Sequence, residues 1–372
     1  MRRTGRRPHR RRNPTPAVPE RPCPMTEISI AGRPIGPDHP PFIIAEMSAN
    51  HNGDLGRALA LLEAAAAAGA DAVKLQTLKP DAITIDCDRP DFVIEGGPWG
   101  GRKLYDLYAE AQTPWDWHAK LFERGRELGL IVFSSPFDKA AVDFLAGLDA
   151  PAFKIASFEM ADPGLVAHAA AKGKPIIVST GMAGLGDIAA TVETVRRAGN
   201  DQLVLLHCIS SYPAPTEEAN LATIPHMAQA FGVPVGLSDH TQGTAVAVTA
   251  VALGACVVEK HFTLRRADGG LDSHFSLEPE ELAQLVKDCR TAWVARGRIS
   301  YALAECEQGS KAFRRSLYVV EDLHPGEIIT EDKVRSIRPG YGLEPKFLPE
   351  ILGRKARKAV PRGTAFDWSM IE

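Results

Sequence analysis

The alternation of short β-branched runs with longer helical stretches restricts the fold of this chain more than any other feature. From Phe42 onward, eight apolar runs rich in Val, Ile and Phe are each followed by a segment rich in Ala, Leu, Glu or Arg. Glycine-containing stretches such as "ELGL" and "RAGND" stop the helical segments. The candidate strands are residues 42–47, 71–77, 131–137, 152–157, 175–180, 203–208, 235–240 and 257–262.

Eight β/α units over about 250 residues match the number and size expected of an α/β TIM (β/α)8 barrel. A doubly wound sheet is the competing arrangement. The even spacing of the units favours the barrel, and so do the polar residues at the ends of the strands, because barrel active sites lie at the carboxyl ends of the strands. We therefore predict a catalytic TIM barrel over residues 25–297.

The sequence after the barrel has a different character. Residues 298–312 form a polar linker, and residues 313–372 combine short strand candidates with Pro-Gly turns. A β-rich module of about 60 residues would be marginally stable alone, so we expect it to pack on something. Residues 1–24 hold eight Arg and one Glu and lack the apolar region of a secretory signal. They are either a nucleic-acid-binding arm or, as we prefer, a disordered basic leader without a function.

The six cysteines are scattered and form no CxxC pair. This spacing indicates neither a zinc knuckle nor a disulfide framework, and it suits a reducing cytoplasm. No apolar run approaches the ~20 residues that span a bilayer. We therefore expect a cytoplasmic protein.

Two lysines, Lys74 and Lys154, stand inside otherwise apolar strand candidates. A buried lysine needs a partner, which is either a structural glutamate or an anionic ligand. Hydroxyl groups at neighbouring strand ends favour a ligand with a phosphate or carboxylate group. Either lysine could instead form a Schiff base with a carbonyl substrate. The hydroxyl residues are Ser134, Ser135, Ser157, Ser179 and Thr180.

Two further features follow the strands. Glu217 and His240 come after the sixth and seventh strand candidates, and a His with a carboxylate suits Mn²⁺, Mg²⁺ or Zn²⁺. His207 and His261 are additional candidates for the same metal. The long segment 78–113 contains "EGGPWGGRKLYDLY". A loop of this length in a compact domain predicts a lid or wall over a site.

Several motifs together resemble the sialic acid synthase family of nonulosonic acid synthases. They are "IIAEMSANHNG", "ADAVKLQT", "FSSPFD", "FKIASFE", "IIVSTGMA", "YPAP", "VGLSDHT" and "EKHFTL", in this order. The resemblance covers about residues 28–372 and implies a TIM barrel followed by an antifreeze-like (SAF) domain. It also implies a transferase that condenses phosphoenolpyruvate with an N-acylated amino sugar.

Within the family, four signatures resemble the branch that makes pseudaminic acid from 2,4-diacetamido-2,4,6-trideoxy-L-altrose. They are "EMSANHN", "TPWDWH", "RADGGLDSHFSLEP" and "FRRSLYVVEDLHPGE". Sister branches make N-acetylneuraminic or legionaminic acid with the same chemistry and remain alternatives. A Schiff-base aldolase and a non-enzymatic carbohydrate-binding protein are rivals from other classes, and we favour them less.

The resemblance also implies roles for individual residues. Glu46 would handle protons, Glu159 would lie near the sugar, and His240 would bind a divalent metal, Mn²⁺ or Mg²⁺. Glu217 stands where the sialic acid branch has a second metal-binding His. Arg315, or its neighbour Arg314, would reach into the barrel of the partner in a homodimer. The residues expected to bind phosphoenolpyruvate or the sugar are Lys74, Gln76, Ser135, Lys154, Ser157, Ser179, Asn50 and His51.

Overall fold

The computed structural model describes residues 27–372, so the predicted leader, residues 1–24, lies outside the described residues. The chain divides into two compact units after Gly297, and the second unit is Arg298–Glu372. No helix in residues 27–372 is both long and apolar enough to cross a membrane.

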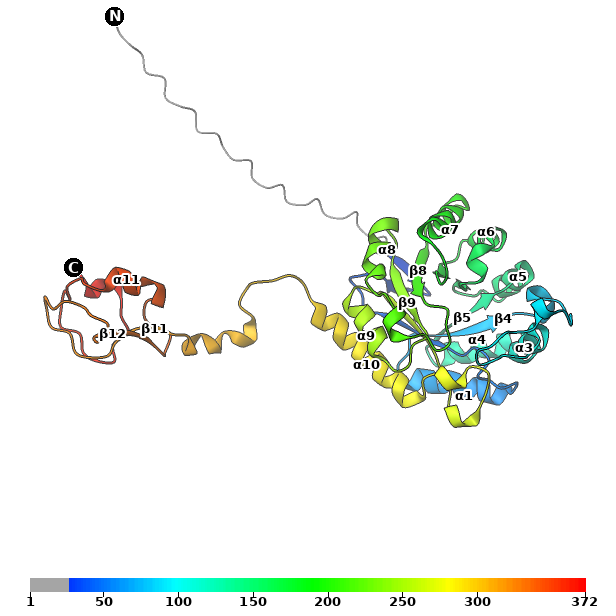
Figure 1. The fold of residues 1–372 in the computed structure, drawn as a ribbon, viewed down its shortest axis with the longest axis horizontal. Coiled ribbons are helices and arrows are strands. Elements are labelled where there is room, and N and C mark those ends of the chain that lie inside the picture. Colours follow the sequence, from blue (N-terminus) through cyan, green and yellow to red (C-terminus); the bar gives the residue numbers. More distant parts are fainter. Residues whose placement is uncertain (1–26) are drawn as a thin grey trace, which may run out of the picture. The chain divides into compact units, whose positions relative to one another are not determined.

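The first unit is a closed barrel of eight parallel strands with helices around it (Figure 1). The last strand pairs with the first, with Val257 beside Phe42 and His261 beside Glu46. This closure confirms the predicted TIM barrel and excludes the doubly wound sheet, which would leave two free edges. The strands are β3 (Phe42–Glu46), β4 (Ala72–Thr77), β5 (Ile131–Pro136), β6 (Phe153–Ile155), β7 (Ile176–Ser179), β8 (Leu203–Cys208), β9 (Val235–Asp239) and β10 (Val257–His261).

Helices cover the outside of the barrel because each presents an apolar stripe to the strands. In α1, for example, the buried residues Ala58, Leu61, Leu62 and Ala65 recur at helical spacing. Asp54 caps the start of this helix by accepting a hydrogen bond from the Arg57 backbone N–H. The main helices are α1 (Leu55–Ala67), α3 (Leu104–Ala111), α4 (His118–Glu127), α5 (Lys139–Gly147), α6 (Pro163–Ala170), α7 (Leu185–Arg197), α8 (Thr223–Phe231), α9 (Ala245–Ala252) and α10 (Pro279–Arg296).

The interior of the barrel is apolar at one end and polar at the other. Side chains alternate along each strand, so Phe42 and Ile44 of β3 face the interior and Glu46 follows them in the same row. The hairpin of β1 (Ile28–Ile30) and β2 (Arg33–Ile35) packs on the apolar residues and closes the amino-terminal end. The carboxyl-terminal end is therefore left for the polar side chains.

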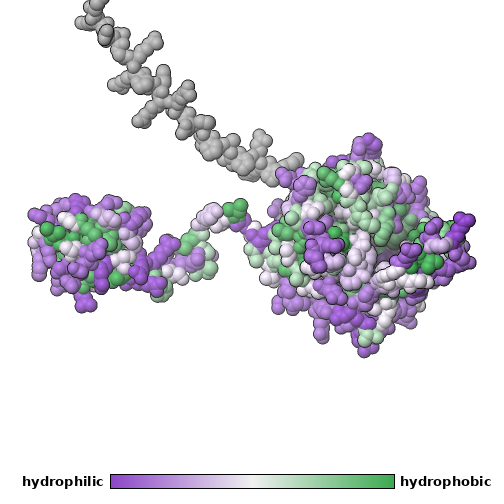
Figure 2. Space-filling view, in the orientation of Figure 1, coloured by the Kyte–Doolittle hydropathy of each residue, from purple (hydrophilic) through white to green (hydrophobic). Residues whose placement is uncertain are grey.

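The second unit has a hydrophobic core of its own, which includes Leu317, Val334 and Phe366. Its strands β11 (Ser316–Val319) and β12 (Val334–Ile337) pair antiparallel, and the short helix α11 (Leu348–Ile351) joins the same core. In both units the visible surface mixes hydrophilic side chains with smaller apolar areas (Figure 2). Such scattered apolar surface is usual for globular domains.

Candidate active site

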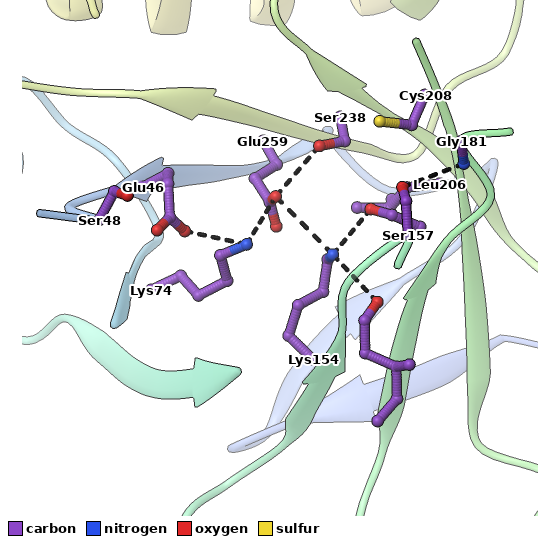
Figure 3. Close-up of polar contacts among 12 residues, drawn as sticks. Glu46, Ser48, Lys74, Lys154, Ser157, Gly181, Leu206, Cys208, Ser238 and Glu259 are labelled. Atoms are coloured by element: carbon purple, nitrogen blue, oxygen red, sulfur yellow. Dashed lines mark hydrogen bonds and ion pairs between the residues drawn. The ribbon is translucent and has the colours of Figure 1, made fainter. Parts of the chain in front are cut away.

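Four charged side chains meet in the barrel interior at the carboxyl ends of the strands (Figure 3). Lys74 Nζ lies 2.8 Å from Glu259 Oε1 and 2.9 Å from Glu46 Oε2. Lys154 Nζ lies 3.9 Å from the same Glu259 oxygen, which also accepts a 3.1 Å hydrogen bond from Ser238 Oγ. The structure thus gives Lys74 two carboxylate partners, while Lys154 has one distant carboxylate.

The ionisation of this cluster follows from burial and from the mutual charges. Burial lowers the pKa of Lys74 to about 8, and the charge of Glu259 opposes this effect. Burial by itself would raise the pKa of Glu259, but the charges of Lys154 and Lys74 outweigh it and bring that pKa to about 2. At neutral pH the carboxylate is therefore ionised and Lys74 is largely protonated.

One side of the cluster is lined by hydrogen-bonding groups that suit an anion. Lys154 Nζ donates a 2.7 Å hydrogen bond to Ser179 Oγ, and the Gly181 backbone N–H donates one of 3.0 Å to Ser157 Oγ. A Cβ at Gly181 would lie 2.1 Å from Ser210 Oγ, so this close approach of backbone to hydroxyl groups needs glycine. Together these groups form a cradle of hydroxyl and N–H groups beside an ammonium group. A cradle of this kind can hold a phosphate or a carboxylate.

Ser135 also faces this interior space from β5. Its hydroxyl is buried and has no hydrogen-bond partner in the structure. A buried hydroxyl without a partner is costly unless a ligand or water satisfies it. Ser135 is therefore positioned to bind a ligand together with the lysines.

Two histidines approach each other at the ends of β9 and β10. The ring centroids of His240 and His261 are 5.4 Å apart. Nδ1 of His261 is buried without a hydrogen-bond partner, and burial lowers the pKa of this imidazole far below its usual value. His240 Nδ1 lies 2.9 Å from the carbonyl oxygen of Ile209, which fixes its ring. Burial alone would lower the pKa of His240, but its hydrogen bond with Cys208 outweighs this effect and raises that pKa. Two oriented imidazoles, one of them with an unpaired nitrogen, fit a divalent metal that keeps further positions open for substrate.

Glu217, the other predicted metal ligand, is placed differently. It lies on the short 3₁₀ helix η4 (Thr216–Glu218), where its side chain is exposed. Within residues 27–372, no three or more His, Cys, Asp or Glu side chains form a group that could hold a metal. His207 points out of the barrel and its Nε2 lies 2.7 Å from the Ala219 carbonyl oxygen. Of the three candidates for a second metal ligand, His261 is therefore the one that the structure brings close to His240, and His207 and Glu217 are not.

A chain of hydrogen bonds connects Glu46 to a loop after the last strand. Gln76 Nε2 lies 3.3 Å from Glu46 Oε1 and donates a 2.9 Å hydrogen bond to Ser48 Oγ. The Ser48 hydroxyl in turn donates to the Asp272 carboxylate, whose pKa is raised by burial. Asp272 also lies 4.0 Å from the unpaired His261 Nδ1. Asp272 lies within the motif "RADGGLDSHFSLEP" but was not among the predicted site residues.

Glu159 is the residue predicted to lie near the sugar. Glu159 is half-buried on the 3₁₀ helix η3 (Glu159–Ala161), and burial raises its pKa while the charges of Lys154 and Lys74 lower it. Its Oε2 is buried without a hydrogen-bond partner, as Ser135 Oγ is. These observations place Glu159 within electrostatic range of both lysines.

Asn50 and His51 are fully buried in the loop after β3. Asn50 Nδ2 donates to the Phe262 carbonyl oxygen at 2.9 Å, and His51 Nε2 lies 3.3 Å from Thr113 Oγ1. Their contacts hold the loop that carries Ser48. Arg315 lies in the second unit, where it is exposed and donates a 3.1 Å hydrogen bond to the Ser336 carbonyl oxygen.

The fold and this site define a TIM-barrel protein with an anion cradle and paired histidines at the catalytic end. A model of the NeuB family matches residues 61–301, and a model of the SAF domain matches residues 314–372. The chain belongs to the NeuB family, and the predicted resemblance and SAF domain are confirmed.

Relatives with assigned activities cover nearly the whole chain. A pseudaminic acid synthase from Campylobacter jejuni is 45% identical over 88% of this chain and 96% of its own. A pseudaminic acid synthase from Helicobacter pylori is 41% identical over 90% of this chain and 98% of its own. An N,N'-diacetyllegionaminic acid synthase from Legionella pneumophila is 36% identical over 89% and 94%.

Solved structures agree with the assignment of this chain to the family. An N-acetylneuraminic acid synthetase from Leptospira borgpetersenii matches with a TM-score of 0.70 and 31% identity, over 77% of this chain and 95% of that one. The spore coat polysaccharide biosynthesis protein SpsE from Bacillus subtilis matches with a TM-score of 0.65 and 33% identity, over 93% and 99%.

Proposed function

We propose that this protein is a pseudaminic acid synthase. It condenses phosphoenolpyruvate with 2,4-diacetamido-2,4,6-trideoxy-L-altrose to give pseudaminic acid and phosphate. The observation that carries the chemistry is the anion cradle around Lys154 beside the Lys74–Glu259 ion pair. The choice of sugar is supported by relatives named pseudaminic acid synthase, which are 45% and 41% identical to this chain.

Phosphoenolpyruvate brings a phosphate and a carboxylate to the site, and the cradle offers groups for both. Lys154 and the hydroxyl groups of Ser135, Ser157 and Ser179 hold these anions, and Lys74 adds a second positive charge. Because the lysines are anchored by Glu259, they are preorganised and need not rearrange as the reaction proceeds. Gln76 positions Glu46 by hydrogen bonding.

The reaction joins C3 of phosphoenolpyruvate to the aldehyde carbon of the open-chain sugar, and the aldehyde oxygen takes up a proton. Positive charge then develops at C2, where the carboxylates of Glu46 and Glu259 can stabilise it. Water adds to C2, a carboxylate such as Glu46 accepts its proton, and the C2–O bond breaks so that phosphate leaves with the bridging oxygen. Glu159, whose pKa is raised by burial, is a candidate proton donor on the sugar side.

The site fits a divalent metal ion, Mn²⁺ or Mg²⁺, at His240 and His261. When bound there, such an ion would polarise the sugar aldehyde as a Lewis acid. Glu217 remains a second candidate ligand from the family resemblance, although its side chain is exposed. Metal dependence is thus part of the proposal, with the histidine pair as its main support.

A Schiff-base mechanism is the alternative chemistry for the two lysines. It requires a neutral lysine in an apolar pocket. Lys74 is instead held between two carboxylates, and Lys154 donates to Ser179. These partners favour anion binding over imine formation.

The assembly and its location are also proposals. We place the protein in the cytoplasm, in keeping with the free cysteines of the described residues. We propose a homodimer in which Arg315, or Arg314, of the SAF domain completes the site of the partner.

The proposed function is tested by incubating the protein with phosphoenolpyruvate, Mn²⁺ and one sugar at a time while measuring phosphate release. We expect turnover with the 2,4-diacetamido-2,4,6-trideoxy sugar and full loss of activity with EDTA. Turnover with N-acetylmannosamine alone would instead assign the protein to the sialic acid branch. Borohydride trapping of a pyruvate adduct would indicate the aldolase.

A further inference from the structure

The long segment between β4 and α4 folds partly into a small hairpin. Val93 and Lys103 form an antiparallel bridge, and the Ile94 N–H donates a 2.9 Å hydrogen bond to the Arg102 carbonyl oxygen. Glycines with positive φ at 96, 97 and 101 allow the chain to turn sharply on either side of Trp99. The hairpin therefore presents a single large aromatic side chain near its tip.

Trp99 is fixed against the catalytic end of the barrel. Its indole Nε1 donates a 3.1 Å hydrogen bond to the carbonyl oxygen of Leu271, the residue before Asp272. Its ring centroid lies 5.8 Å from that of Tyr212, whose ring is 4.3 Å from that of His240. The ring of Tyr212 is thus the only one between Trp99 and the candidate metal ligand His240 in this series of contacts.

Phe275 is buried and packs behind Tyr212. Its ring lies 5.4 Å from Tyr212 and 4.8 Å from His261. We call Trp99, Tyr212 and Phe275 the aromatic wall. The wall borders the histidine pair, whereas the anion cradle is built from β6, β7 and the loops that follow them.

The reaction geometry orients the sugar between these two regions. The aldehyde carbon has to meet phosphoenolpyruvate, which occupies the cradle, close to the histidine pair. The rest of the sugar must then extend away from the cradle. Of the wall, the half-buried rings of Trp99 and Tyr212 lie beside the histidines, with Phe275 buried behind them. A methyl group can pack against aromatic faces, whereas a hydroxyl group there needs a hydrogen-bond partner.

We propose that Trp99 is a specificity-determining residue: with the rest of the aromatic wall it receives the C6 methyl group of the 6-deoxy sugar and disfavours a 6-hydroxyl group. This inference rests on the proposed function and refines its choice of substrate. The indole N–H of Trp99 is already used by Leu271, so it has no donor left for a 6-hydroxyl group. A sugar with a hydroxymethyl group loses hydration at the wall without compensation from Trp99.

The test compares two sugars that differ by one oxygen, the 6-deoxy substrate and its 6-hydroxy counterpart, in wild type, Trp99→Ala and Trp99→Phe. We expect Trp99→Ala to reduce the preference for the 6-deoxy sugar, as the ratio of the two kcat/KM values, by about tenfold. The KM for phosphoenolpyruvate should stay within about twofold of wild type, because the cradle is untouched. Trp99→Phe keeps an aromatic face and should retain most of the preference.

Trp293→Ala is the matched control. Trp293 is also half-buried and donates its indole N–H to a backbone carbonyl oxygen, that of Pro37 at 3.3 Å, but it lies on α10 outside the site. The sugar preference of the Trp293→Ala variant should equal that of the wild-type protein. Circular dichroism melting of each variant checks folding, and if Trp99→Ala is unfolded the comparison uses Trp99→Gln, which replaces the apolar ring with a hydrogen-bonding group.

An unchanged preference in a folded Trp99→Ala or Trp99→Gln variant would overturn this inference while leaving the proposed function standing. Failure of the proposed function looks different, since the wild-type protein would then turn over neither of the two sugars.

Discussion

Lys74 donates a 2.8 Å hydrogen bond to Glu259 across the interior of the barrel, from β4 to β10. Both side chains are almost completely shielded from water. Lys154 also lies 3.9 Å from the same carboxylate oxygen, so one carboxylate serves two ammonium groups. The proposed chemistry depends on this shared carboxylate. It stabilises two buried positive charges that would be costly to bury without a partner.

Removing the Glu259 carboxylate should destabilise the barrel. In Glu259→Ala, Lys74 and Lys154 lose their shared partner, and breaking a buried ion pair typically costs about 3–5 kcal/mol. Urea denaturation followed by circular dichroism measures the free energy of unfolding. Glu123→Ala, at an exposed position on α4, is the control and should change it by less than about 0.5 kcal/mol. Equal stability of Glu259→Ala and wild type would show that the lysines do not need this partner.

Binding of phosphoenolpyruvate should weaken as the pH rises above about 8. Burial lowers the pKa of Lys74 to about 8, so this side chain loses its positive charge at a lower pH than an exposed lysine does. An anion binds best to the protonated form, and its affinity therefore falls between about pH 7 and about pH 9. Calorimetric titration of the protein with phosphoenolpyruvate measures the effect.

Lys74→Arg is the matched variant for this experiment, because arginine stays charged throughout the range. Its affinity for phosphoenolpyruvate, although weaker at neutral pH, should depend less on pH. A wild-type affinity that is constant from about pH 7 to about pH 9 would remove Lys74 from anion binding.

Mn²⁺ binding should require both histidines of the pair. His240→Ala and His261→Ala each remove one ligand, so we expect the dissociation constant for Mn²⁺ to rise by at least about tenfold. Electron paramagnetic resonance of free Mn²⁺ gives this constant without any turnover. Glu217→Ala, with Glu218→Ala as its exposed neighbour control, tests the ligand implied by the family resemblance. Loss of Mn²⁺ binding in Glu217→Ala but not in His261→Ala would reverse our choice of second ligand.

Sites completed in trans should be recoverable by mixing two inactive proteins. On the proposed account, Glu46→Gln should inactivate the barrel and Arg315→Ala should remove the SAF contribution, so a mixed dimer would contain one intact site. Random exchange of subunits should restore about a quarter of wild-type activity. Arg335→Ala, at an exposed position of the same unit, should be active by itself.

Arg314→Ala replaces Arg315→Ala if the latter retains activity. Complementation by neither arginine variant, with each inactive alone, would contradict completion by the partner subunit.

Local patterns in the sequence were sufficient for the barrel and for the residues facing its interior. Buried parallel strands are short apolar runs, and such runs predict the eight strands of the barrel. Lys74 and Lys154 are charged residues inside these runs, which indicates that they face a site. Alternation along a strand could also have separated His207 from His261. His207 precedes the inward-facing Cys208 and points outward, whereas His261 follows Glu259 by two residues and points inward.

The rest of the site depends on contacts between distant segments, which local patterns do not contain. The approach of His240 to His261 requires β9 and β10 to be neighbours in register, with Asp239 beside Lys260. The link from Ser48 to Asp272 joins residues 224 positions apart. The placement of the Trp99 hairpin at the site likewise depends on its contact with Leu271, which is distant in the sequence.

The most direct test of the central claim uses phosphoenolpyruvate labelled with ¹⁸O at the oxygen between C2 and phosphorus. The protein is incubated with Mn²⁺ and 2,4-diacetamido-2,4,6-trideoxy-L-altrose, and both products are analysed by mass spectrometry. The account predicts sugar-dependent formation of a nonulosonic acid, with the label found entirely in the inorganic phosphate. Label retained in the sugar acid, or no phosphate released with this sugar, would contradict it.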